Sequence, residues 1–405
     1  MLRMIPPAGA PIRIQEIMYS YRYLFSPCFE ELKKGFSQYL KTKHIFFFSS
    51  GRAGLSVILK ALHKLSDRRE VIIPAYTCFS VPSAIARVGL KITPCDIEPT
   101  TLDFSLSKLQ RLVTEETLAI IPVHLFGLSS RIDEVLKIAK GCGACTISDV
   151  AQAMGARLHN QPLGGFGDVA LFSLGRGKNI TALQGGIIAT NSDLYAQAIQ
   201  EEMDGLDPIT FKKRLLIHLS LWLYSIFLRP QLYWLPNSLP FLELGLSKFS
   251  LDYEVSSFYK FLSYIALSQL RNLDAVNRMR REKADYLIKG LKDLPYLFIP
   301  SPISGSSPCY LRLPVLIAEP DLREEIYREL TQKGIGVSKM YPASIDEIPE
   351  VEPYLSEKTK PCLSAQRVAK EILTLPTHTL VTKKDLDKTI VIFRKCNRSG
   401  YTSRV

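Results

Sequence analysis

The sequence predicts an α/β protein with a large, mostly parallel sheet and a smaller α/β domain at its C-terminal end. Between about residues 44 and 190, short apolar runs alternate with segments whose apolar residues recur every three or four positions. Such alternation is typical of βαβ units, which build parallel sheets covered by helices on both faces. After about residue 293, shorter runs of the same two kinds indicate a second α/β unit.

Seven strands are expected in the first half of the chain. In chain order they cover 44–50, 70–76, 90–97, 117–126, 144–150, 168–174 and 185–190. Helical periodicity follows the first, second and fourth of them, over 51–65, 80–89 and 131–143. A long helical region is expected at about 253–291, before the smaller domain. The smaller domain is expected to contain the runs at 309–317, 321–337 and 388–396.

The length of 405 residues suits two or three domains. We expect a large domain over 1–204, an apolar insert over 205–250, a connecting helix region over 251–292 and a small C-terminal domain over 293–405.

The composition is that of an ordinary globular protein, and its charge is basic. The 51 Lys and Arg residues exceed the 39 Asp and Glu residues, and the net charge of +12 favours nucleotides, phosphates or acidic membrane surfaces as partners. No DNA-reading motif points to nucleic acid. Cys142 and Cys145 form a pair with no second pair or nearby histidine, so no metal site is expected. Sparse cysteines and a start without a secretion signal predict a reducing, cytoplasmic setting.

Polar residues stand where the predicted strands end. Ser50 and Gly51 open a helix after the first strand, and the free N–H groups of such a helix bind phosphate. Asp149 ends a buried strand, where a carboxylate is costly unless a cation pairs with it. Ser173 ends the next strand, and Lys178 follows five residues later. In doubly wound sheets, ligands bind at these strand ends.

A phosphate-binding turn, a strand-end carboxylate and a nearby lysine together match the needs of pyridoxal 5'-phosphate. The aldehyde of this cofactor bonds to a lysine amine, its pyridine nitrogen pairs with a carboxylate, and its phosphate needs backbone and hydroxyl donors. The alternative is that each residue has a separate capping or turn role, which the spacing alone does not exclude.

Several ordered motifs resemble the DegT-type (StrS-type) sugar aminotransferases, which are pyridoxal phosphate enzymes of fold type I. The resemblance is carried by "SSGRAGL", "VIIPAYTCFSV", "AIIPVHLFGLSSRID", "SDVAQAMGA" and "DVALFSLGRGKNITALQGGIIAT", and later by "KGIGVSKMYPA" and "LTLPTHTLVTKKDL". It covers most of the chain except about 205–250. It implies a fold type I large domain and a smaller C-terminal α/β domain.

The resemblance also implies roles for individual residues. Lys178 would bond covalently to the cofactor and carry the proton between substrate and cofactor, and Asp149 would pair with the pyridine nitrogen. Gln152 would contact the ring hydroxyl. The phosphate would be held by Ser173 and by the backbone of Gly51, Arg52 and Ala53.

Three positions depart from the family pattern. Cys78 stands where relatives place an aromatic residue on the cofactor ring, and Phe79 or Tyr76 are the alternatives for that contact. Gln184 replaces the acidic residue before the double glycine. The segment 255–257 holds Val-Ser-Ser where relatives lend an asparagine to the partner subunit's phosphate site. These changes affect phosphate and substrate contacts, and they leave Lys178 in place.

The resemblance predicts an aminotransferase that moves an amino group from glutamate or glutamine to a nucleotide-linked keto-sugar, in surface polysaccharide or glycan biosynthesis. The alternatives are amination of another ketone, which could be lipid-linked, and a non-catalytic regulatory protein that keeps the fold. Lys178 argues against the sugar-dehydrating branch of the family, where a histidine replaces the lysine. Relatives build each site from two subunits, so a homodimer is expected.

The family pattern does not explain the segment 212–242. Its apolar run over 215–228 would form a helix of roughly 21 Å, which is too short to span a membrane. On a helical wheel, Arg214, His218, Ser225 and Arg229 form one stripe interrupted by Leu221. We expect either a helix lying in the membrane interface, with Trp222, Tyr224, Tyr233 and Trp234 at headgroup level beside Lys212, Lys213 and Arg214, or a buried insert or dimer element.

Overall fold

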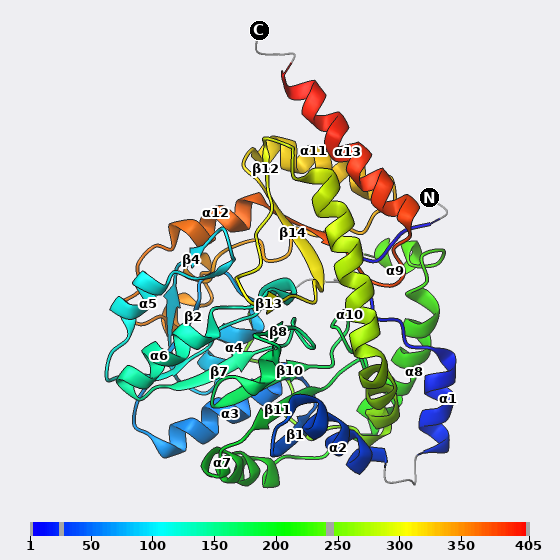
Figure 1. The fold of residues 1–405 in the computed structure, drawn as a ribbon. Helices are drawn as coiled ribbons and strands as arrows, with labels where there is room; N and C mark the ends of the chain where they lie inside the picture. Colours follow the sequence, from blue (N-terminus) through cyan, green and yellow to red (C-terminus); the bar gives the residue numbers. More distant parts are fainter. Residues whose placement is uncertain (1–2, 24–27, 240–246, 402–405) are drawn as a thin grey trace.

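The computed structural model describes residues 3–23, 28–239 and 247–401, with backbone alone for 397–401, around a seven-stranded sheet (Figure 1). The strand order is β1-β11-β10-β7-β6-β2-β3. The bounds are β1 His44–Phe48, β2 Glu70–Pro74, β3 Lys91–Cys95, β6 Thr117–Ile120, β7 Cys145–Asp149, β10 Val169–Ser173 and β11 Gly186–Thr190. All pairings from β10 to β3 are parallel, while β11 runs antiparallel to β1 and β10. The prediction of an α/β protein with a mostly parallel sheet is confirmed.

Helices cover the sheet on both faces, which explains why its strands are continuous apolar runs. In β2, Val71 and Ile73 pack under α3 and α4, while Ile72 between them packs under α5 and α6. The first layer consists of α3 Gly51–Leu65, α4 Ser80–Arg87 and α7 Asp193–Asp204. The second consists of α5 Leu106–Leu112, α6 Ile132–Cys142 and α2 Cys28–Leu40.

The C-terminal part forms its own antiparallel sheet in the order β12-β14-β15. Leu330 of α11 and Phe393 of α13 pack on Val315 of this sheet, so the part has a separate apolar core. The elements are β12 Leu297–Phe298, β14 Arg312–Ile317, α11 Pro320–Gln332, α12 Leu363–Glu371, β15 Ile372–Pro376 and α13 Lys383–Tyr401. Two-residue strands complete the structure: β4 Ile97–Glu98, β5 Asp103–Phe104, β8 Arg157–Leu158, β9 Gln161–Pro162 and β13 Ser306–Ser307.

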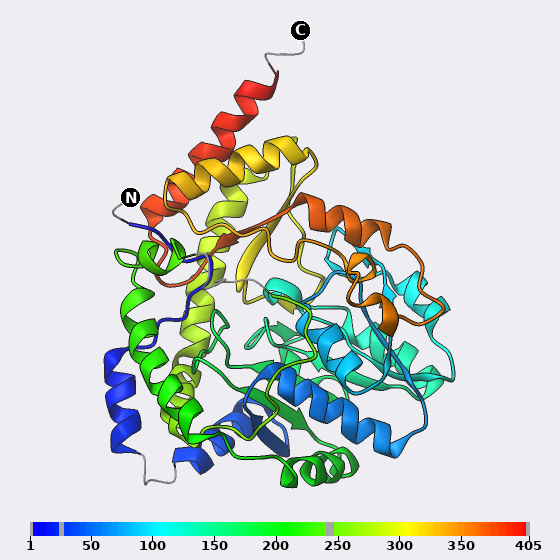
Figure 2. The same ribbon diagram turned by 180° about the vertical axis from the view of Figure 1, so that it is seen from behind.

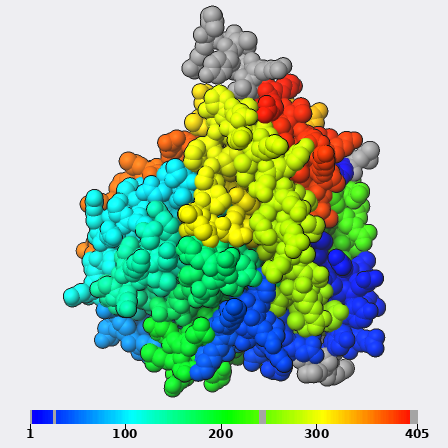
Figure 3. Space-filling model, viewed as in Figure 1, coloured from blue at the N-terminus to red at the C-terminus, as the bar shows by residue number. Residues whose placement is uncertain are grey.

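Helix α10, Ser263–Leu291, connects the two sheets. Its 29 residues make it about 43 Å long, and it runs along one face of the molecule from α2 to α13 (Figures 1 and 3). Buried Arg280 on this helix donates hydrogen bonds to the carbonyl oxygens of Leu311 and Gly9, each at 3.0 Å. One side chain therefore ties the long helix to the C-terminal sheet and to the N-terminal segment.

The N-terminal segment packs against the C-terminal part rather than on the large sheet. Arg3 forms an ion pair with Asp385 at 2.6 Å, and the Ile5 N–H donates to the Gly334 carbonyl oxygen at 2.8 Å. A Cβ atom on Gly336 would lie 2.3 Å from the Ile5 carbonyl oxygen, so the two backbones are in close contact. The domain boundaries given above stay a prediction, and these contacts link residues 3–5 to the last part of the chain.

The predicted apolar helix forms as α8, Phe211–Phe227, followed by the short α9, Trp234–Asn237. It lies beside α1, Ile14–Arg22, at one edge of the molecule (Figure 2). Residues 240–246 of the predicted insert lie outside the described residues. Within the described part of the chain, no helix has both the length and the apolar character needed to cross a membrane.

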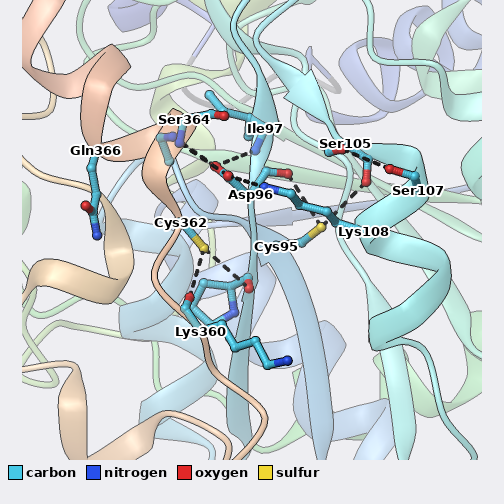
Figure 4. A network of polar contacts seen from close by, with 12 residues as sticks. Cys95, Asp96, Ile97, Ser105, Ser107, Lys108, Lys360, Cys362, Ser364 and Gln366 are labelled. Carbon is cyan, nitrogen blue, oxygen red and sulfur yellow. Dashed lines mark hydrogen bonds and ion pairs between the residues drawn. The ribbon is translucent and has the colours of Figure 1, made fainter.

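Asp96 joins the large sheet to the C-terminal part, as Figure 4 shows. It follows β3 and accepts hydrogen bonds from the Ala365 N–H at 2.9 Å and the Ser364 N–H at 3.2 Å, at the N-terminus of α12. Lys108 donates to the same carboxylate at 2.6 Å. Burial opposes ionisation, but the bonds from Lys108 and from backbone N–H groups outweigh it and hold the pKa of Asp96 below its usual range. The ionised side chain thus caps a helix that lies 267 positions further along the chain.

We expect Asp96→Ala to lower the free energy of unfolding by about 1–2 kcal/mol, because α12 loses its cap. Asp96→Asn keeps one acceptor and serves as the matched control with a smaller loss. A lowered pKa in the folded state means that the advantage of Asp over Asn is complete above about pH 4 and disappears as the pH falls through the lowered pKa. Urea unfolding at pH 7 and pH 3 measures both effects, and equal stability of all three proteins at pH 7 would contradict this assignment.

Candidate active site

A cavity of about 360 Å³ opens where β7 and β10 end and α3 begins. Six of the seven residues predicted for the site line it: Gly51, Arg52, Asp149, Gln152, Ser173 and Lys178. The seventh, Ala53, is buried behind them, and its N–H donates to the Ser50 Oγ at 3.0 Å. The structure therefore brings together residues that are up to 127 positions apart in the chain.

Asp149 is buried and Lys178 is half-buried beside this cavity, and the two side chains carry opposite charges. The Asp149 carboxylate accepts a hydrogen bond from the Ala151 N–H at 2.9 Å, and the described residues offer it no direct ion pair. Burial raises the pKa of Asp149, and the Ala151 N–H and the Lys178 charge offset this only in part. Burial likewise lowers the pKa of Lys178, against the opposing effects of Cys78 and Asp149. The site therefore holds a carboxylate that needs a cation and an amine that loses its proton readily.

The turn from β1 into α3 presents backbone N–H groups to the cavity. Ser50 caps α3, and the N–H groups of Gly51 and Arg52 in the first turn have no partner within the helix. The Ser173 Oγ lies 3.5 Å from the position that a Cβ atom on Gly51 would take, so the hydroxyl faces the same turn. A helix N-terminus with an adjacent hydroxyl is suited to bind an anion such as phosphate.

Gly186 makes this turn possible, which explains part of the double glycine in the sequence. A Cβ atom on Gly186 would lie 2.3 Å from the Ser50 carbonyl oxygen and 2.7 Å from the Gly51 nitrogen. Gly185 adopts a φ of +131°, a conformation that other residues rarely take. The first residues of β11 therefore lie directly against the turn.

Gln152 and Cys78 line the cavity near Lys178. The Gln152 Nε2 donates to the Tyr341 hydroxyl at 2.9 Å, and its Oε1 accepts from the Phe126 N–H at 3.2 Å, so the amide is held on both sides. Burial opposes ionisation of Cys78, yet the Lys178 charge and hydroxyl hydrogen bonds lower the pKa of this thiol overall.

The two aromatic residues weighed as replacements for a stacking residue do not line the cavity. Tyr76 and Phe79 are buried and pack against the ring of Tyr341, with ring centroids 5.6 and 5.8 Å apart. Cys78 lies between them in the chain and does reach the cavity. A sulfur atom therefore occupies the position where relatives are expected to place an aromatic ring.

Among the cavity residues that were not predicted from the sequence, Lys213, Tyr253 and Glu254 come from the part of the chain after residue 204. Lys213 and Glu254 form an ion pair at 3.4 Å. The guanidinium carbon of Arg52 lies over the Tyr253 ring, 4.9 Å from its centroid, in a cation–π contact. These residues belong to the first turn of α8 and to the segment after the insert, where no motif or periodicity marks a ligand contact.

The segment that departs from the family pattern at 255–257 packs on its own subunit. The Ser49 N–H donates to the Ser256 carbonyl oxygen at 3.0 Å, and the Ser256 N–H donates to the Ser49 Oγ at 3.2 Å. Ser257 forms an isolated bridge with Phe48 at the end of β1. This segment therefore supports the β1–α3 turn from behind.

The residues present fit pyridoxal 5'-phosphate. Buried Asp149 lacks a cationic partner among the described residues, and a protonated pyridine nitrogen would supply one. Lys178 can reach the same cavity with an amine whose pKa is lowered, and the α3 turn with Ser173 can receive a phosphate. Each group of the cofactor has a counterpart of suitable chemistry.

Known proteins were compared with the chain. The family model of the DegT/DnrJ/EryC1/StrS aminotransferase family matches residues 12–212 and 258–394, which leaves out most of the predicted insert. A pleiotropic regulatory protein of Geobacillus stearothermophilus is 34% identical over 185 residues, 45% of this chain and 50% of its own length. A GDP-perosamine synthase of Caulobacter vibrioides is 34% identical over 179 residues, 44% of this chain and 48% of its own length. The chain thus spans about half the length of these two curated relatives.

Solved structures share the fold over nearly the whole chain. The structure of DesI in the presence of its TDP-sugar product superposes with a TM-score of 0.79 at 21% identity and covers 100% of this chain and 96% of its own. At this identity the likeness shows the fold alone. The matched family segments span both α/β parts and all seven predicted site residues. The predicted resemblance is confirmed, and the chain belongs to the DegT/DnrJ/EryC1/StrS aminotransferase family.

Proposed function

We propose that the protein is a pyridoxal phosphate-dependent aminotransferase that moves an amino group from glutamate or glutamine to a nucleotide-linked keto-sugar. The observation that carries this proposal is the pair of oppositely charged groups, buried Asp149 and half-buried Lys178, beside one cavity with an anion-binding turn. The GDP-perosamine synthase name and the TDP-sugar product named for the DesI structure support a nucleotide-linked substrate. Synthesis of a surface polysaccharide or glycan is the process that we infer.

Each proposed role follows from a side chain's surroundings. When bound, the cofactor supplies an electron-accepting ring that stabilises negative charge at the substrate carbon. Asp149 would keep the ring nitrogen protonated, and its burial strengthens this interaction because little water screens it. Lys178 would hold the cofactor covalently and then move a proton to and from the substrate carbon, which a lowered pKa favours.

The remaining residues would orient and bind. Gln152 would contact the ring hydroxyl, with its amide already fixed by Tyr341 and Phe126. The phosphate would be bound by Ser173 and by the first turn of α3, through the backbone of Gly51 and Arg52, with Ala53 directly behind them.

The cavity rim suits an anionic substrate. Lys213 and Arg52 line it, and the net charge of +12 attracts a diphosphate over longer distances. A lysine at position 178 favours amino transfer over the dehydration reaction in which relatives carry a histidine. We also infer a homodimer, as the resemblance implies. The sparse cysteines support our inference of a cytoplasmic setting.

A second candidate function is amination of a lipid-linked ketone. It is favoured by the exposed leucines of α8, the helix whose first turn contributes Lys213 to the cavity. A third candidate, a regulatory protein that keeps the fold, takes support from the name of the Geobacillus relative. Bound cofactor that changes its absorption on addition of an amino donor would exclude the third candidate.

The direct experiment loads the purified protein with pyridoxal 5'-phosphate and follows its visible absorption during addition of glutamate, glutamine or other amino acids. The proposal expects one of the first two to convert the bound cofactor to its amine form, and a nucleotide-linked keto-sugar to convert it back. If no donor changes the spectrum of loaded protein, the proposed activity is wrong. Conversion back by a lipid-linked ketone alone would establish the second candidate.

Lys178→Ala should abolish transamination, with a loss of at least 10²–10⁴-fold from missing proton transfer alone. The variant should still bind the cofactor through Asp149 and the phosphate turn, but the cofactor should be removable by dialysis. Lys213→Ala, which changes another cavity lysine, is the matched control and should keep the covalent attachment. Retained turnover in Lys178→Ala would remove this lysine from its proposed role.

Asp149→Asn should reduce turnover by about 10- to 1000-fold, because the ring nitrogen loses the carboxylate that raises its pKa by about one to three. The same variant should raise the unfolding temperature of the cofactor-free protein at pH 7 by about 2 °C. The sign follows from the raised pKa of Asp149, since a carboxyl group that resists ionisation destabilises the fold above that pKa and ceases to do so below it. Unchanged turnover, or a lower unfolding temperature at pH 7, would contradict the assignment.

Gly186→Ala should weaken cofactor binding at least tenfold, because its methyl group would displace the Ser50 and Gly51 backbone that we assign to the phosphate. Gly141→Ala is the control, since a Cβ atom there meets no atom within 4 Å. Spectroscopic titration with pyridoxal 5'-phosphate compares the two variants. Equal affinities would show that the β1–α3 turn does not bind the phosphate.

A further inference from the structure

We propose that α1 and α8 form a docking surface for an anionic lipid membrane, with α8 lying parallel to the membrane plane. This surface, which we call the α1–α8 face, is distinct from the cavity and goes beyond the proposed transamination. It does not require a membrane-spanning segment, and α8 at about 25 Å is shorter than the ~30 Å hydrocarbon core.

Helix α8 is apolar on two opposite faces. Ile217 and Leu221 point toward the protein and are 3% and 0% exposed. On the other side Leu215, Leu219 and Leu223 are 62%, 56% and 44% exposed. The predicted polar stripe does not explain this exposure, because Ser225 of the stripe and Leu221, which interrupts it, are both buried. The helix therefore turns its outer leucines to solvent, which is unfavourable for a row of this size unless another apolar phase covers it.

Helix α1 extends the same surface. The Tyr21 hydroxyl and His218 Nδ1 of α8 share a hydrogen bond at 2.9 Å, and their rings stack at 5.4 Å, so the two helices are directly adjacent (Figure 2). Ile14 and Met18 of α1 are 40% and 56% exposed. The exposed apolar residues thus belong to two neighbouring helices that are almost 200 positions apart in sequence.

Aromatic side chains border the face. Tyr19, Tyr21 and Trp234 are each more than 40% exposed, which suits the headgroup region of a bilayer. Three of the four aromatic residues expected there do not fit. The Tyr224 hydroxyl donates inward to the Ala10 carbonyl oxygen at 3.2 Å. Trp222 is half-buried in the large domain's core, and Tyr233 is half-buried as well.

The positive charge of α1 and of the segment around α8 favours an anionic membrane as the partner that covers this face. The sequence from 208 to 242 contains no acidic residue, and its cations Lys212, Arg214 and Arg229 are exposed. The fourth cation, Lys213, already forms an ion pair with Glu254 beside the cavity. In α1 the one acidic residue, Glu16, is buried and accepts hydrogen bonds from Ser268 and from the Arg13 backbone, while Arg22 is exposed. A twofold self-contact through this face would bring these cations against their own copies. Anionic lipid headgroups would neutralise them and the acyl chains would cover the leucines.

Helix α8 separates this face from the cavity. Lys213 in the first turn of α8 lines the cavity, and Leu215 begins the exposed row two residues later. Two residues along a helix are about 200° apart, so these two side chains point to opposite sides of α8. Lipid on the exposed row would therefore lie on the other side of the helix from the cavity.

The experiment is vesicle co-sedimentation of the full-length, cofactor-loaded protein. Vesicles of phosphatidylcholine with 30% phosphatidylglycerol are compared with pure phosphatidylcholine, at low and high salt. We expect binding to the anionic vesicles that weakens as salt rises. Leu215→Glu/Leu219→Glu should weaken it at least tenfold. Leu194→Glu, which changes a leucine that is 59% exposed on α7, is the matched control and should bind as the wild type does.

The other results each decide the proposal. Wild-type protein that stays in the supernatant with anionic vesicles would overturn it. So would equal binding of the double variant and the wild type, or equal binding to both kinds of vesicle. If light scattering without lipid shows that the double variant alone becomes monomeric, and the wild type ignores vesicles, a second copy occupies this face. Cofactor absorption and circular dichroism confirm that each variant is folded, and transamination activity is measured separately, so failure of the proposed reaction does not affect this result.

Discussion

The organisation of this protein depends on holding two opposite charges, buried Asp149 and half-buried Lys178, at one cavity without joining them directly. Asp149 ends a central strand that is buried on both faces, and its carboxylate has one backbone hydrogen bond and no ion pair among the described residues. An arrangement of this kind costs stability in the empty protein. A cationic group bound beside the carboxylate would offset this loss of stability, and the cavity next to both residues offers the space for it.

The surrounding fold positions these two groups. Parallel strands deliver Asp149 and Ser173 to one edge of the sheet, and β11 comes so close to the β1–α3 turn that only glycine fits at position 186. Behind the turn, Ser256 exchanges hydrogen bonds with Ser49. The C-terminal part is attached through Asp96, which caps α12. The cavity is therefore built from contacts that reach across most of the chain.

Much of this could be predicted from the sequence, for local reasons. Each strand of the large sheet is a short apolar run, and polar residues at strand ends such as Asp149 stand out because they interrupt buried segments. Lys213, Tyr253 and Glu254 could not be predicted as cavity residues, since they come from α8 and from the segment after the insert, which meet the other cavity residues only in the folded chain. The cap formed by Asp96 and the packing of Ile5 beside Gly334 are likewise tertiary contacts without a sequence pattern.

Helix α8 shows the same limit in another way. Its apolar run predicts a helix and excludes a span, but the sequence alone does not say which of its two apolar sides faces the protein. The structure buries Leu221 and exposes Leu219. Folding of the chain therefore explains the apolar inner side of α8, whereas the apolar outer side requires a binding partner to explain it.

The central claim is that Lys178 is the residue that bonds to the cofactor. The most direct measurement treats the protein loaded with pyridoxal 5'-phosphate with borohydride, digests it and locates the reduced cofactor by mass spectrometry. The account predicts one modified peptide, carrying the adduct on Lys178. A stable adduct on another lysine, such as Lys213, with Lys178 unmodified, would contradict it.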